Sequence, residues 1–261
     1  MGQLRLSFSQ VQTASNCMAR WGFEKRYKLP QTTNVNAVMG QALHEGVATY
    51  YRKKMGKMTG ADPSTVFADH LYKGCEDPQI KAKTTTQEID NLWGAGTALI
   101  TKYIDEIGQH ITPKIVEGDV GGFFGDISIT GRVDLMDDQG VIVDLKSAER
   151  TPAGIDPSEI EQLAFYALLI HGKRPEEMPE VDGQIHYLVK GKITTLVETV
   201  RLTHEDYRFA FSHVQTVAQV LQNIDFLPPN RSKMNFLCSH SACSFAAACE
   251  QMYGGRVRGS A

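Results

Sequence analysis

The sequence has no long apolar run and only five cysteines in 261 residues. None of its segments approaches the roughly 18 uninterrupted apolar residues of a membrane span. Its first residues, Met-Gly-Gln-Leu-Arg-Leu-Ser, contain no apolar core of a secretory signal. We therefore expect a cytoplasmic protein that makes no membrane contact, and structural disulfides are not expected in that compartment.

The sequence also has little net charge. A formal charge of −3 argues against a protein that coats nucleic acid nonspecifically. It is compatible with an enzyme that acts on nucleic acid, because only a groove has to be positive and active-site carboxylates lower the total. With 42% hydrophobic and 22% charged residues, the composition is that of an ordinary globular protein, and the length allows one domain with insertions.

Hydrophobic periodicity predicts helices in the first part of the chain and strands after them. Ser7 and Gln10 have the spacing of a capping box at the start of the first helix. Helices are predicted over about 7–20, 36–54, 64–73, 86–110, 158–171 and 203–224, with a loop at about 74–83. Strands are predicted over about 115–120, 122–136, 141–146, 181–189 and 193–201. Helices combined with a mixed sheet predict the α/β class.

Two of the predicted strands carry three charged side chains, Asp134, Asp144 and Lys146, into a hairpin that should be buried. Because side chains alternate along a strand, Asp144 and Lys146 point to the same face. Unpaired charges inside a sheet are costly, but a divalent cation between two carboxylates makes them tolerable. Lys146 would then orient or deprotonate a water molecule, or stabilise negative charge. The alternative is a surface hairpin with an ordinary Lys–Asp pair.

Two helical motifs flank this hairpin in the sequence. Gly40 and His44 lie four residues apart on one helical face, where the glycine allows close backbone approach and the imidazole could bind Mn²⁺. Gln162 and Tyr166 form a second pair with the same spacing and could contact a DNA phosphate or position a base. The alternatives are an ordinary core or surface histidine and the polar edge of an amphipathic helix.

The cysteines also form a pattern. Cys238, Cys243 and Cys249 are spaced C-x4-C-x5-C, and three soft thiolates in a reducing compartment suggest metal binding. Cys17 is the natural candidate for a fourth ligand, whereas Cys75 is structural or free. Four thiolates suit tetrahedral zinc, in which His240 could replace a cysteine, and plain buried thiols are a further alternative.

The order of the motifs carries more information than any one of them. Gly-x-x-x-His, Gly-x-x-Asp, Asp-x-Lys and Gln-x-x-x-Tyr, in this order, resemble the RecB-like branch of the PD-(D/E)XK nuclease superfamily from Ser7 to Cys249. The resemblance implies a restriction-endonuclease-like mixed β-sheet core flanked by helices. It implies that His44, Asp134, Asp144 and the backbone carbonyl of Leu145 hold Mg²⁺ or Mn²⁺, that Lys146, Asp144 and Asp134 are catalytic, and that Gln162 and Tyr166 lie near DNA.

The surroundings of Cys17, with Arg20, Phe23 and Tyr27 after it, resemble the iron–sulfur nucleases of this superfamily. These include CRISPR-associated exonucleases, cluster-bearing helicase–nuclease subunits and mitochondrial-type single-strand exonucleases. The resemblance implies a 4Fe–4S cluster held by Cys17, Cys238, Cys243 and Cys249 that joins the two chain ends. The chain departs from it in two places: C-x4-C replaces the usual C-x2-C, and Met18 replaces a proline. Zinc is therefore the alternative to the cluster at these cysteines.

These expectations combine into one hypothesis. We expect a single nuclease domain over 1–253, with a helical insertion at about 55–110, the nuclease core at about 113–201, a C-terminal helix and cluster segment at about 203–253, and a disordered tail from 254 to 261. The resemblance implies a DNA exonuclease of recombination and repair that degrades single-stranded ends, in the 5′ to 3′ direction. The alternatives are a DNA-end binding and trimming subunit that works with a recombination, helicase or integrase partner or in CRISPR adaptation, and a restriction-type endonuclease.

Overall fold

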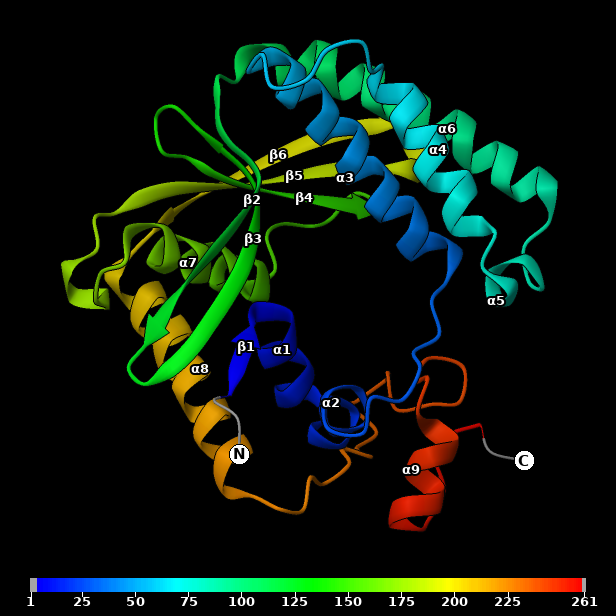
Figure 1. The fold of residues 1–261 in the computed structure, drawn as a ribbon, viewed down its shortest axis with the longest axis vertical. Helices are drawn as coiled ribbons and strands as arrows, with labels where there is room; N and C mark the ends of the chain where they lie inside the picture. Colours follow the sequence, from blue (N-terminus) through cyan, green and yellow to red (C-terminus); the bar gives the residue numbers. More distant parts are fainter. Residues whose placement is uncertain (1–3, 260–261) are drawn as a thin grey trace. The chain divides into compact units, whose positions relative to one another are not determined.

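The computed structural model describes residues 4–259, and its helices and strands are labelled in Figure 1. The chain divides into two units, each with its own internal contacts. The first unit contains Met1–Thr32, Gly121–Thr130 and Phe211–Ala261, and the second unit contains Thr33–Val120 and Gly131–Ala210. The expected single domain over 1–253, with its internal boundaries, stays a prediction.

The first unit begins with β1 (Arg5–Ser7), α1 (Phe8–Asn16) and α2 (Met18–Lys25), and it also contains α9 (Ala246–Tyr253). Helix α1 starts where the sequence predicts, because the Ser7 side chain accepts a hydrogen bond from Gln10 N. The continuous helix predicted over 7–20 is wrong. Cys17 adopts an extended backbone, with φ −162° and ψ 107°, and separates α1 from α2. Its sulfur accepts a hydrogen bond from Asn230 N, a tertiary contact that the helical periodicity does not encode.

The second unit begins with the long helices α3 (Val35–Lys54), α4 (Pro63–Cys75) and α6 (Thr86–Glu106), which confirm the three helices predicted there. The 3₁₀-helix η1 (Gly108–His110) follows α6, and α5 (Pro78–Lys81) lies between α4 and α6. The loop predicted at 74–83 is therefore wrong in part. Asp77 caps α5 by accepting from Gln79 N, and Pro78 fits the first position of a helix because it has no N–H to lose.

The strands form one mixed sheet. They are β2 (Pro113–Phe124), β3 (Ile127–Asp137), β4 (Ile142–Ala148), β5 (Val181–Val189) and β6 (Thr194–Leu202), and the order is β1-β3-β4-β5-β6 with β2 paired to β3. β4 and β5 are parallel, whereas β3 and β4, like β5 and β6, are antiparallel. This sheet with flanking helices confirms the predicted α/β class.

One strand boundary differs from the prediction. β2 continues beyond residue 120 to Phe124, and the chain turns at Gly125, whose φ of +63° favours glycine. The connection from β4 to β5 runs through α7 (Pro157–His171) and the 3₁₀-helix η2 (Pro175–Glu177), as parallel pairing requires. The 3₁₀-helix η3 (Lys190–Lys192) joins β5 to β6, and α8 (His204–Asn223) follows β6.

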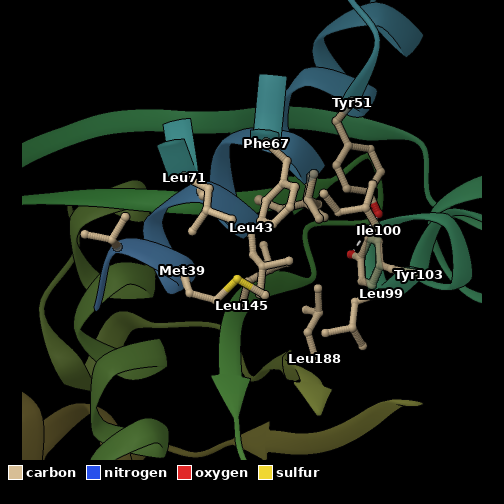
Figure 2. Packing of buried hydrophobic residues seen from close by; sticks show 14 of the residues in the cluster. Met39, Leu43, Tyr51, Phe67, Leu71, Leu99, Ile100, Tyr103, Leu145 and Leu188 are labelled. Atoms are coloured by element: carbon tan, nitrogen blue, oxygen red, sulfur yellow. Dashed lines mark hydrogen bonds between the residues drawn. The ribbon is translucent and has the colours of Figure 1, made fainter. Parts of the chain in front are cut away.

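The core of the second unit lies where α3, α4 and α6 pack on β4 and β5. Figure 2 shows Met39 and Leu43 of α3 with Leu71 of α4 against Leu145 and Leu188 of the two strands. All five side chains are buried. Complete burial of a side chain of this size contributes about 1.5–3 kcal/mol to folding, so this packing fixes α3 on the sheet.

Helix α7 packs on β5 through its own apolar side. A Cβ atom at Gly183 of β5 would lie 2.9 Å from Leu163 Cδ1 of α7, so the glycine permits close contact. Leu145 points into the core of α3, α4 and α6, and side chains alternate along a strand. Asp144 and Lys146 of β4 therefore lie on the α7 side of the sheet.

The chain after Gly254 was expected to be disordered, but residues 254–259 make specific contacts. Val257 is buried and packs with Phe245 and Cys249. Arg258 pairs with Ser239 in an isolated β-bridge, and its guanidinium donates to the Cys238 carbonyl at 3.4 Å. Burial of the apolar Val257 side chain stabilises this segment. The last two residues of the expected tail lie outside the described residues.

Candidate metal centre and cysteine cavity

The two predicted carboxylates lie on adjacent antiparallel strands. Leu135 of β3 pairs with Val143 of β4, and the residues next to this pair are Asp134 and Asp144. The Asp134 carboxylate is oriented by the neighbouring strand, because its Oδ2 accepts a hydrogen bond from Leu145 N at 2.8 Å. The residue predicted to contribute a backbone carbonyl thus holds Asp134 through its N–H.

Helix α3 brings His44 to the same place. His44 Nδ1 lies 3.6 Å from Asp134 Oδ1 and 3.6 Å from Glu117 Oε1 of β2. One turn earlier, Gly40 allows the helix to approach β4, since a Cβ atom there would lie 3.1 Å from Ser147 Oγ. Ligand atoms of His44, Glu117 and Asp134 all lie within 4.8 Å of one another. Two carboxylates and an imidazole fit Mg²⁺ or Mn²⁺ by their chemistry.

Glu117 is a further candidate metal ligand, and no sequence motif predicted it. Its φ of +45° lies in the left-handed region, which costs a non-glycine residue about 1–3 kcal/mol. Only a tenth of its side chain is exposed, and the carboxylate faces His44. A carboxylate directly before Gly118, after the apolar pair Ile115 and Val116, was the available signal. Such strain is found where the surrounding structure holds a residue in a functional position.

The carboxylates at this position determine the protonation state of His44. Burial by itself lowers the pKa of the imidazole, but hydrogen bonding and charge from Asp134 and Glu117 outweigh it and raise the pKa to about 10. In the absence of a cation, the protonated imidazole therefore balances the two carboxylates. A divalent cation that uses His44 as a ligand has to replace this proton.

Lys146 connects Asp144 to helix α7. Lys146 Nζ lies 2.8 Å from Asp144 Oδ2 and donates to Gln162 Oε1 at 2.9 Å. Gln162 Nε2 donates in turn to the Tyr166 hydroxyl at 3.2 Å. The two residues that were expected near DNA thus hold the lysine. Gly131 leaves room for this arrangement, since a Cβ atom there would lie 2.7 Å from Tyr166 Cε1.

Asp144 is almost completely buried, with 2% of its surface exposed. Burial raises the pKa of this carboxyl and Asp134 adds to the effect, whereas Lys146 opposes it. The Lys146 ammonium is therefore the charge that keeps the Asp144 carboxylate in a buried position. Asp144 stands beside the group of His44, Glu117 and Asp134, with Lys146 as its own partner. We call these five residues the candidate metal centre.

An open cleft lies beside the candidate metal centre. It has a volume of about 440 Å³. Its lining comes from α3, α4, β2 and β3: Gly40, Gln41, His44, Glu45, His70, Glu117 and Arg132. Because His44 and Glu117 are part of this wall, a cation bound to them would be accessible through the cleft.

The four cysteines of the predicted cluster line one cavity in the first unit, together with Phe23, Phe245, Val257 and Arg20. All of them are free thiols, and we call this space the cysteine cavity. Cys75, in contrast, is buried in the core of the second unit among α3, α4 and α6. The cavity brings together the first helices and the C-terminal segment of the first unit: Cys17, Cys238, Cys243 and Cys249.

The cysteine site can be compared with the sulfur positions that a single zinc ion requires. Among residues 4–259, no three cysteine sulfurs all lie within 4.8 Å of one another. A single tetrahedral zinc, with Zn–S of about 2.3 Å, would bring its sulfurs to about 3.8 Å. His240 is not part of the cavity wall, and its Nε2 lies 3.3 Å from Glu250 Oε2. Of the side chains in the cavity wall that commonly bind metals, all are therefore cysteines.

No helix within the described part of the chain is long and apolar enough to cross a bilayer. Residues 5–250 match a family model described as the PD-(D/E)XK nuclease superfamily. No match was found among curated proteins. A crystal structure of a provisionally named exonuclease from Eubacterium rectale is similar at 14% identity with a TM-score of 0.56, covering 86% of this chain and 84% of that one. The structure of SSO0001 matches at 13% identity over 92% and 94% of the chains, but its TM-score of 0.36 carries no argument.

Proposed function

Because this chain belongs to the PD-(D/E)XK nuclease superfamily, we propose that it is a metal-dependent DNA exonuclease that hydrolyses phosphodiester bonds at DNA ends. Membership supports a nuclease with a restriction-endonuclease-like fold and a DNA substrate. The observation that carries the proposal is that His44, Glu117 and Asp134 converge beside the Asp144–Lys146 pair, next to an open cleft. The name of the E. rectale neighbour supports the exonuclease class.

Mg²⁺ or Mn²⁺ would be held by His44, Asp134, Asp144 and the Leu145 carbonyl, and Glu117 adds a further carboxylate. When bound, such a cation neutralises charge on the phosphate and lowers the pKa of a water molecule. Asp134 is held ready by the Leu145 N–H, so little reorganisation is needed. Lys146 orients the attacking water and stabilises the developing negative charge, and Gln162 keeps its ammonium in place.

We also propose single-stranded DNA ends as the substrate, a cytoplasmic location, and action alongside recombination or repair partners. The resemblance of the motif order to RecB-like nucleases supports the substrate and the partners, and the N-terminal sequence without an apolar signal core supports the location. The open cleft supports a flexible strand, because it is lined by side chains that can reach a phosphate, such as Gln41, His70 and Arg132. DNA strands are commonly held by basic and polar side chains that follow the backbone.

The second part of the proposal is a 4Fe–4S cluster held by Cys17, Cys238, Cys243 and Cys249. The cysteine cavity fits such a group because all four donors are sulfur and its walls are largely apolar. The resemblance of the sequence around Cys17 to iron–sulfur nucleases supports the cluster over zinc. A cluster there would tie α1 and α2 to the C-terminal segment within the first unit.

The test of the nuclease is a cleavage assay on linear and on closed circular single-stranded DNA with Mg²⁺ or Mn²⁺. Asp144→Ala and Lys146→Ala should each lower the rate by at least about 100-fold, the lower range for loss of one such group. Lys192→Ala, an exposed lysine of η3, is the matched control and should cleave as the parent does. Full activity of both site variants would overturn the assignment. Cleavage of the circle would indicate an endonuclease instead.

A further inference from the structure

Two adjacent residues of the first unit contact the sulfur atoms of the first and the last cysteine of the cysteine cavity. Asn230 N donates to Cys17 Sγ at 3.4 Å, and Arg231 Nη2 donates to Cys249 Sγ at 3.3 Å. Cys17 and Cys249 lie near opposite ends of the sequence. One short segment thus positions ligands from both ends of the chain.

Arg231 is held tightly in this position. Its Nη2 also donates to the Cys249 carbonyl at 3.1 Å, and its Nη1 donates to the Gly254 carbonyl. A Cβ atom at Gly255 would lie only 2.6 Å from Arg231 Nη1, so the glycine leaves room for the guanidinium. The fork of the guanidinium therefore binds one cysteine through both its sulfur and its carbonyl.

One donor of this side chain is still available. Arg231 Nε is buried and has no hydrogen-bond partner among the described residues. A buried donor without an acceptor is destabilising, and such groups are rare in folded proteins. The guanidinium thus keeps one unused donor next to the Cys249 sulfur that it already contacts.

Asn230 is fixed by its neighbours as well. Its side-chain amide donates to the Asn16 carbonyl at 2.9 Å, directly before Cys17. Its own carbonyl accepts from Asn235 Nδ2 at 2.8 Å, and its Oδ1 accepts from Ser232 N at 3.2 Å. The N–H that binds the Cys17 sulfur is thus held by contacts on both sides.

We infer that Asn230 and Arg231 are positioning residues of the proposed iron–sulfur centre, and that Arg231 stabilises its reduced state. The inference rests on the cluster proposed above. Reduction adds one electron from an external reductant and breaks no bond, so it leaves the thiolate-bound cluster more negative. Arg231 is always protonated, and its hydrogen bond to a ligand sulfur strengthens as the negative charge on that sulfur grows. Hydrogen bonds to the sulfurs are among the factors that set the potential of such clusters.

The test compares the midpoint potential and the iron content of the full chain after anaerobic reconstitution. In Arg231→Met, the equilibrium constant for one-electron reduction should fall about tenfold, which corresponds to a potential lower by about 59 mV. Iron should be released to a chelator about tenfold faster, as is typical when a partner of a metal ligand is lost. Arg231→Lys keeps the charge but not the fork, and its potential should fall less.

Arg256→Met is the matched control, because it removes an exposed arginine of the first unit, in the segment that follows α9. It should leave both potential and iron release unchanged. Gly255→Ala is an independent variant, because its Cβ would lie 2.6 Å from Arg231 Nη1 and because alanine is strained at the φ of +68° there. Both effects displace the Arg231 guanidinium, so the potential should shift in the direction of Arg231→Met. If Arg231→Met assembles no cluster, the potential of Gly255→Ala still tests the role of Arg231.

Three outcomes would contradict the inference, and the third would also contradict the proposed cluster. Equal potentials and equal iron release in the parent, Arg231→Met and Arg256→Met would overturn it. So would a higher potential in Gly255→Ala and Arg231→Lys. A parent that takes up neither iron nor sulfide would overturn the proposed cluster together with this inference. The cleavage assay with Asp144→Ala and Lys146→Ala reports separately on the nuclease.

Discussion

The side chains of the candidate metal centre project from a long helix and adjacent strands, whereas the cysteines of the cysteine cavity come from a helix junction, a loop segment and the short helix α9. His44 lies on α3, and Asp134 is held by a backbone N–H of β4. Cys17 separates two helices, and Cys238 lies in a segment without regular structure. The candidate metal centre is thus positioned by regular secondary structure, whereas the proposed cluster would itself connect the segments that carry its cysteines.

The cysteine cavity should therefore depend on its metal more than the metal centre does. Cys243→Ala should remove essentially all iron and lower the melting temperature of the anaerobically prepared protein, because binding free energy at such a site is folding free energy. Cys75→Ala is the matched control, since it truncates a buried cysteine in the second unit. Iron analysis measures the iron content of each variant, and thermal unfolding measures its melting temperature. Full iron content in Cys243→Ala would contradict the ligand assignment.

A smaller effect is expected at the metal centre from Glu117. Glu117→Gln keeps the size of the side chain but removes a carboxylate that faces His44 at 3.6 Å. Mn²⁺ should bind about tenfold more weakly, at the low end for the loss of a residue that supports a metal site, with iron content unchanged. Electron paramagnetic resonance of free Mn²⁺ measures the affinity, and Glu205→Gln on the exposed start of α8 is the control. If Glu117→Gln binds Mn²⁺ as the parent does, Glu117 is no ligand and its strained backbone needs another explanation.

The regular part of the fold explains how much of the candidate metal centre could be predicted. Alternation along a strand relates Asp144 to Lys146, and helical spacing relates Gly40 to His44, so both motifs could be read without coordinates. Glu117 could not be placed in this way, because its positive φ interrupts the alternation of β2.

The features that the sequence did not predict depend on tertiary contacts. The spacing of Gln162 and Tyr166 shows that they share a helix face but not what lies opposite, which is Lys146. In the first unit, the helix predicted through Cys17 breaks there, and the tail expected to be disordered is packed through Val257. Both differences arise from contacts between the two ends of the chain, which local patterns do not contain.

The smallest predicted effect concerns the support of Lys146. Tyr166→Phe removes the hydroxyl that accepts from Gln162 Nε2, a single neutral hydrogen bond worth about 1 kcal/mol. The cleavage rate should therefore fall by about fivefold, while Tyr50→Phe, which removes a hydroxyl elsewhere in the second unit, should have no effect. Single-turnover cleavage of linear DNA is the measurement. A loss as large as that of Lys146→Ala would show that Tyr166 acts on the substrate rather than through Gln162.

The most direct test of two separate centres compares Mn²⁺ binding in the parent, Asp134→Asn and Cys243→Ala. Electron paramagnetic resonance under anaerobic conditions measures this binding. Asp134 lies in the candidate metal centre and Cys243 in the cysteine cavity. We predict that Asp134→Asn loses Mn²⁺ binding but keeps its iron, and that Cys243→Ala loses iron but still binds Mn²⁺. Mn²⁺ binding that survives Asp134→Asn and disappears in Cys243→Ala would contradict the account.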